Sequence, residues 1–252
     1  MDNTRQFLKL LKKNFRERGL LKFISSALFF IYRNIILGGE YLIYCIFNKT
    51  FLRRISYKKW KSFFQRHEKE AWLKKSKNEG FPIEYHHISR DFFYDFLPSN
   101  FFTSKKTVVD LGCGPKGVIE YIDDNFKICI DSLALFYKEK FKLNEKSHFV
   151  AAVGEILPLK DESIDLVICT NTLDHMFYPH KAVQEIYRVL KKRGLFFVEV
   201  FLKEKDRYNH PFDFSLVYFK SLMGNFVTIK ETIIKKDFSY PPRAIGLFRK
   251  GI

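Results

Sequence analysis

A glycine-rich turn flanked by acidic residues is the part of this sequence with the clearest chemistry. Gly112, Gly114 and Gly117 follow a short apolar run, and Asp131 lies 19 residues after the first glycine. The apolar run predicts a buried parallel strand, and glycines let the backbone approach a ligand where such a strand ends. An acid at the end of the next strand can accept hydrogen bonds from ribose hydroxyls. The spacing therefore predicts a nucleoside-binding site at the carboxyl edge of a sheet.

Asp110 discriminates between two kinds of cofactor. The three glycines fit the dinucleotide pattern G-x-G-x-x-G. However, a carboxylate two residues before the first glycine would repel a pyrophosphate and attract the ammonium of an amino-acid-like ligand. S-adenosylmethionine has that ammonium, a ribose and no phosphate. These residues therefore favour S-adenosylmethionine over NAD.

Four segments, in this order, resemble the class I S-adenosylmethionine-dependent methyltransferases of the type 11 methyltransferase-domain family. They are residues 108–117, 129–132, 154–167 and 185–194, and the likeness extends over residues 80–250. The resemblance implies S-adenosylmethionine as the cofactor. It also implies a set of cofactor-binding residues, namely Asp110, Gly112, Cys113, Gly114, Asp131, Ser132, Val153, Gly154, Glu155 and Asn171.

The resemblance also implies roles for some of these residues. In the family, the residue matched by Asp110 organises the loop around the methionine moiety, and the residue matched by Asp131 holds the ribose. The segment after Thr170 passes the methionine end, and the backbone at Val153 lies near the adenine edge. The family often has Asp where this chain has Val153. Adenine would then be held by backbone, by Glu155 or by water.

Strands and helices are predicted to alternate along the same region. Strands are expected at 107–111, 126–130, 148–152, 164–170 and 195–201, with an antiparallel pair at 226–235 and 243–249. Helices are expected at 116–123, 133–141 and 180–191. The alternation predicts an α/β fold with a Rossmann-like doubly wound sheet, mostly parallel and with an antiparallel closing strand.

Two histidines are candidates for a catalytic base. Methyl transfer is an in-line displacement, so an enzyme mainly aligns the reactants and excludes water, and a base helps where the acceptor is a hydroxyl. His175 follows the fourth predicted strand and has Asp174 beside it as a possible orienting group. His210 follows the fifth strand at the same edge. His175 has an alternative role in packing or at a helix start, and no histidine or cysteine has the spacing of a metal site.

The net charge of +16 is concentrated in the first third of the chain. Residues 1–78 hold 19 Lys and Arg against 5 Asp and Glu, whereas residues 79–252 hold 25 and 23. Residues 4–18 also have an amphipathic helical pattern. We therefore divide the chain into a basic, apolar helical extension, 1–78, and a methyltransferase domain, 79–252. A basic segment of this kind indicates docking rather than chemistry.

Residues 23–47 are apolar but carry Arg33 and Glu40, each of which would cost ~2.5–3.5 kcal/mol at the centre of a bilayer. Both flanks are basic, which suits an anionic headgroup layer. We expect peripheral attachment to the cytoplasmic face of the membrane. Capping of the catalytic core and a true span are the alternatives.

The sequence thus predicts a methyltransferase acting on a hydroxyl or carbon of a lipid-associated or saccharide acceptor. The lipid-associated acceptor is inferred from the basic, apolar extension. The saccharide acceptor is inferred from a loose likeness to sugar-modifying members of the family around His210. The alternatives are an RNA methyltransferase, since basic aromatic segments also bind nucleic acid, and an inactive cofactor-binding scaffold. An NAD-dependent oxidoreductase is disfavoured by Asp110.

Overall fold

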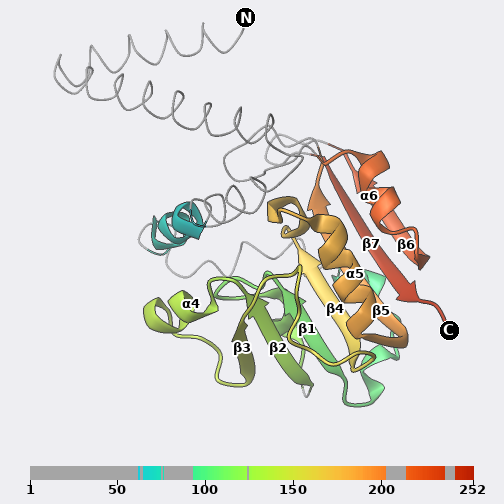
Figure 1. Ribbon diagram of the computed structural model, residues 1–252. Coiled ribbons are helices and arrows are strands. Elements are labelled where there is room, and N and C mark those ends of the chain that lie inside the picture. The colour runs from blue at the N-terminus through green and yellow to red at the C-terminus, as the bar shows by residue number, and fades with distance from the viewer. Residues whose placement is uncertain are drawn as a thin grey trace, which may run out of the picture. The chain divides into compact units, whose positions relative to one another are not determined.

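A seven-stranded sheet with the order β3-β2-β1-β4-β5-β7-β6 organises the protein (Figure 1). The computed structural model describes residues 62, 65–74, 76, 93–123, 125–202, 214–235 and 242–252. All of these residues lie in one unit, Ser62–Ile252. His210 and the predicted membrane segment 23–47 lie outside the described residues.

The strands confirm the predicted mostly parallel sheet. They are β1 (Thr107–Leu111), β2 (Phe126–Asp131), β3 (Ser147–Ala151), β4 (Ile164–Thr170), β5 (Leu190–Phe201), β6 (Phe226–Ile234) and β7 (Arg243–Lys250). β1 to β5 pair in parallel, whereas β7 runs antiparallel to both β5 and β6. β5 begins five residues before the predicted start, because Leu190 already pairs with Ile164 before the register shifts. The strand order reverses between β1 and β4, and at such a point the carboxyl ends of parallel strands flank a crevice.

Two hydrophobic layers cover the sheet, because successive strand residues face opposite sides. Val109 of β1 packs in a cluster with residues of α5 (Pro179–Val189) and α6 (Leu216–Leu222). Its neighbour Val108 packs on the other side, in a cluster that includes Ala134 of α4 (Ala134–Lys140). The sheet is therefore the middle of three layers. None of the helices in the described ranges is long and apolar enough to cross a membrane.

The helix predicted at 116–123 is only a short 3-10 helix, η3 (Val118–Tyr121). The backbone is extended on both sides of it, at Gly117 and at Ile122. The carboxylate of Asp110 accepts a hydrogen bond from the backbone N–H of Ile119 at 3.1 Å. A buried side chain of β1 therefore holds this turn, and the chain returns to the sheet at Phe126 without completing an α-helix.

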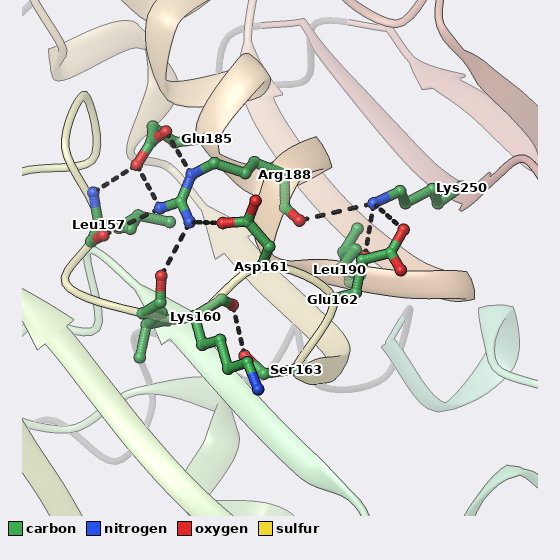
Figure 2. Close-up of polar contacts among 10 residues, drawn as sticks. Leu157, Lys160, Asp161, Glu162, Ser163, Glu185, Arg188, Leu190 and Lys250 are labelled. Carbon is green, nitrogen blue, oxygen red and sulfur yellow. Dashed lines mark hydrogen bonds and ion pairs between the residues drawn. The ribbon is translucent and has the colours of Figure 1, made fainter.

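Arg188 of α5 fastens the loop between β3 and β4 to the domain (Figure 2). Its guanidinium contacts Glu185 at 2.7 Å and Asp161, and it donates to the carbonyl of Leu157 at 3.0 Å. Glu185 in turn accepts the N–H of Leu157 at 2.8 Å. The hydrogen bond from Arg188 is the main reason that the pKa of Glu185 is lowered. Two segments of the family resemblance, 154–167 and 185–194, are therefore joined by these contacts.

We expect Arg188→Met to lower the free energy of unfolding by about 1–2 kcal/mol, since charged hydrogen bonds in a half-exposed site are lost. Urea unfolding at pH 7 measures the change. Lys192→Met is the control, because it removes an exposed positive charge three residues after the helix. Folding favours the ionised form of Glu185. Its contribution to the free energy of unfolding is therefore present above the pKa of an unfolded glutamate, and it is lost as the pH falls through the lower pKa of the folded state. A difference between wild type and variant that persists unchanged at pH 3 would contradict this account.

Candidate cofactor and active site

The glycine loop after β1 is closely packed by side chains from other segments. Gly112 and Gly114 have φ values of 73° and 60°, in the left-handed region that favours glycine. A β carbon on Gly112 would lie 2.1 Å from Cγ2 of Thr172, and one on Gly114 would lie 3.0 Å from the indole of Trp72. The hydroxyl of Thr172 donates to the carbonyl of Thr170 at 2.8 Å. The loop is therefore held between the end of β4 and a residue that precedes the sheet.

Asp110 is buried beneath this loop, with 1% of its surface exposed. A β carbon on Gly117 would lie 2.2 Å from its Oδ2, so the third glycine leaves room for the carboxylate. Burial raises the pKa of Asp110 to about 7, opposed by the hydrogen bond from Ile119. Asp110 thus organises the turn and places a titratable carboxyl under the predicted methionine site.

Asp131 connects the end of β2 to the glycine loop. Its Oδ2 accepts the N–H of Gly114 at 3.1 Å, and its Oδ1 accepts the N–H of Leu133 at 2.8 Å. Burial raises the pKa of Asp131 to about 6, and the two backbone hydrogen bonds oppose that rise. The neighbouring Ser132 is exposed. Since a carboxylate has about four acceptor positions, each oxygen of Asp131 can still accept from a ligand hydroxyl.

The predicted adenine side is a tight turn after β3. Val153 forms an isolated bridge with Ile156, whose N–H donates to the Val153 carbonyl at 3.2 Å. A β carbon on Gly154 would lie 2.5 Å from Cε of Met176. Glu155 accepts the N–H of Tyr178 at 3.2 Å, so its carboxylate also links this turn to the segment after β4.

Asn171, at the end of β4, offers an acceptor to a ligand. Its backbone has a φ of 48°, and its N–H donates to the carbonyl of Glu199 at 2.9 Å. The side-chain Oδ1 is buried and accepts no hydrogen bond from any described residue. An acceptor of this kind, together with the carboxyls of Asp110 and Asp131, fits a cationic ligand such as S-adenosylmethionine. The side chain of Cys113 is buried as a free thiol, so only its backbone is suited to contact a ligand.

His175 ends the 3-10 helix η4 (Leu173–His175), close to the end of β4. Its Nδ1 lies 3.5 Å from Oε1 of Glu68, and the two side chains are 24% and 33% exposed. Asp174 beside it is buried. Within the described ranges, no group of His, Cys, Asp or Glu is arranged to hold a metal ion.

Glu68 and Trp72 contact predicted site residues, and sequence reasoning did not single them out. Both belong to the helical residues 65–74, within the segment that the sequence analysis assigns to the extension. Their spacing of four places them on one face of a helix. That spacing is the only local signal, and it does not indicate which distant residues the face contacts.

Residues 109–198 match the family described as "Methyltransferase domain", and this segment runs from β1 into β5. This segment carries a methyltransferase domain of the class I S-adenosylmethionine-dependent kind. The family and cofactor predicted from the sequence are thereby confirmed, whereas the roles of individual residues in this methyltransferase remain predictions.

Several curated relatives are similar to parts of the methyltransferase. An uncharacterized protein of Methanocaldococcus jannaschii is 33% identical over 149 residues, covering 53% of this chain and 64% of the relative. Thiol S-methyltransferase TMT1B of Rattus norvegicus is 35% identical, covering 38% and 42% of the two chains. Malonyl-[acyl-carrier protein] O-methyltransferase of Enterobacter lignolyticus is 33% identical, covering 35% and 36%. The chain thus spans less than two thirds of each of these relatives.

A solved structure confirms the fold of the methyltransferase. The 1,6-didemethyltoxoflavin-N1-methyltransferase of Burkholderia thailandensis, with bound S-adenosylhomocysteine, superimposes with a TM-score of 0.56. The match covers 76% of this chain and 89% of that chain at 13% sequence identity. At this level of identity the likeness concerns the fold alone.

The raised pKa values of Asp110 and Asp131 predict how the stability of the protein without bound cofactor depends on pH. Because both pKa values are raised from 3.8, the folded state binds more protons than the unfolded state between pH 4 and about 7. The contribution of these groups to stability is therefore present at low pH and is lost as the pH rises through this window. Asp110→Asn should flatten that decline, as measured by urea unfolding from pH 4.5 to 8. An identical slope in wild type and variant would contradict the assignment.

Proposed function

We propose that the protein transfers a methyl group from S-adenosylmethionine to a small-molecule acceptor. The observation that carries the proposal is the arrangement of Asp131, whose two oxygens join the glycine loop to the end of β2 within the segment that matches the family. When bound, S-adenosylmethionine supplies an electrophilic methyl group on a sulfonium.

The residues of this chain suit different parts of that cofactor. Asp131 would accept hydrogen bonds from the ribose, and Asn171 Oδ1 would accept one from the ammonium group. Asp110 would attract the same ammonium through its charge and hold the loop in shape. On the adenine side, Val153 has no polar side chain, so the backbone at Gly154 would make the hydrogen bonds.

His175 is our candidate for removing a proton from the acceptor. It lies near the end of β4, which is one of the two strands, β1 and β4, between which the strand order reverses. Its Nδ1 contacts the carboxylate of Glu68. A carboxylate at this position can orient the imidazole ring, which suits a base that takes a proton from a hydroxyl or thiol. His210 remains a second candidate from the sequence.

The acceptor is a further part of the proposal. The sequence favours a hydroxyl or carbon on a lipid-associated or saccharide molecule, and the names of two relatives add thiol and malonyl acceptors to the set to be tried. The basic, apolar first third supports action at the cytoplasmic face of a membrane. Release of S-adenosylhomocysteine with any of these acceptors would establish the activity, and its absence with all of them would favour a scaffold.

We expect Asp110→Asn to weaken S-adenosylmethionine binding at least ~10-fold, because a charge that faces a cationic ligand is lost. Calorimetric titration of wild type and variant measures the effect. Asp123→Asn is the matched control, since Asp123 is exposed on the loop before β2. Equal affinities for wild type and both variants would refute the assigned role of Asp110.

The ionisation of the same carboxyls should make binding depend on pH. Ionised Asp110 and Asp131 attract a cation, so the affinity should increase as the pH rises from 5.5 to 8, with release of protons on binding. Titrations in buffers with different ionisation enthalpies count those protons. Affinity that falls over this range would contradict the proposed charge complementarity.

Deletion of residues 1–50 tests the membrane part of the proposal. The truncated protein should no longer sediment with anionic liposomes, because the basic and apolar segments are gone, yet it should bind S-adenosylmethionine as the full chain does. Liposomes of neutral lipid are the control for charge. Loss of cofactor binding in the truncated protein would instead assign the deleted segment to capping of the domain.

A further inference from the structure

The helical residues 65–74 contact both sides of the point where the strand order reverses. On the β1 side, ring atoms Cζ2 and Cη2 of Trp72 lie 3.0 and 3.4 Å from the β position of Gly114. The same indole lies edge-on to Tyr137 of α4, with ring centroids 6.1 Å apart. On the β4 side, Glu68 lies 3.5 Å from His175. One face of this segment therefore adjoins the glycine loop and the candidate base together.

Glu68 also acts electrostatically on the predicted ribose site. Burial is the main cause of the raised pKa of Asp131, and the negative charge of Glu68 adds to it. The pKa of Tyr137 is raised mainly by burial and then by the charge of Asp131, and Glu68 makes a smaller contribution. Glu68 therefore adds a further negative charge to a site that already contains Asp110 and Asp131.

The position of Trp72 relates to the chemistry of the cofactor. In S-adenosylmethionine the sulfonium is the covalent junction between the ribose and the methionine chain. In this protein the predicted ribose acid, Asp131, accepts the N–H of Gly114 in the loop assigned to the methionine side. Trp72 packs on that same glycine. An aromatic ring and a carboxylate are the two side-chain groups that attract a cation most directly.

We propose that Trp72 and Glu68 form a cation-selective wall of the cofactor site that binds S-adenosylmethionine more tightly than S-adenosylhomocysteine. The inference rests on the proposed function and extends it, because it assigns specificity to residues outside the segment that matches the family. Transfer of the methyl group turns the sulfonium into a neutral thioether. The attraction of Trp72 and Glu68 is then lost, so the wall favours the donor and promotes release of the product.

Calorimetry with both ligands on the full chain tests this inference. Trp72→Leu should weaken binding of S-adenosylmethionine about three- to tenfold, and leave binding of S-adenosylhomocysteine nearly unchanged. Glu68→Gln should act in the same direction. Glu70→Gln and Leu73→Ala are the matched controls, since both residues are exposed on the same helical segment. These controls should preserve the ratio of the two affinities.

Other outcomes would overturn the inference. Equal weakening of both ligands would mean that Trp72 and Glu68 only support the loop, and unchanged affinities would place them outside the site. Near-ultraviolet circular dichroism checks that each variant is folded. If Trp72→Leu fails to fold, Glu68→Gln alone decides, with Trp72→Phe as the conservative variant that should retain selectivity. A wild-type protein that binds neither ligand would instead refute the proposed function itself.

Discussion

The absence of space around the glycine loop is the constraint on which the candidate site depends. Thr172, Trp72 and Asp110 come from three separate parts of the chain, and each has an atom within 3.0 Å of the position where a glycine β carbon would lie. Close packing of this kind fixes the backbone, since any side chain added there would displace a neighbour. The loop therefore keeps one shape, and its N–H groups and adjoining carboxylates are presented to a ligand in a fixed arrangement.

Burial of acidic groups gives the site its electrostatic character. Asp110 and Asp131 lose water on folding, which raises the pKa of each, and among the described residues backbone N–H groups offset part of that loss. A cationic ligand would supply the missing compensation. Burial of these carboxylates without a cation is unfavourable in free energy, and the charge of Glu68 adds to this effect. Binding of the cationic S-adenosylmethionine would relieve it. Binding of the cofactor should therefore increase the free energy of unfolding of the protein.

The segments that carry the family resemblance have different physical tasks. The glycine loop and Asp131 belong to the predicted site, whereas Glu185 and Arg188 hold the loop that begins at Gly154 (Figure 2). The turn at Lys191–Gly194 lies where β5 shifts register against β4. The segments that resemble the family therefore include residues predicted to bind the cofactor and residues that hold the loop on the predicted adenine side.

Local sequence determined the strands, the mostly parallel character of the sheet, the glycine loop and the acids at the strand ends. Alternation of apolar residues and the backbone freedom of glycine act over a few residues, so they can be recognised in the sequence. The prediction of a helix at 116–123 was wrong, because Asp110 of the preceding strand holds that segment in a short turn. Glu68 and Trp72 became visible only in the tertiary structure, where Glu68 meets His175 from more than a hundred residues away. Such contacts depend on how the whole chain packs, and no local periodicity encodes them.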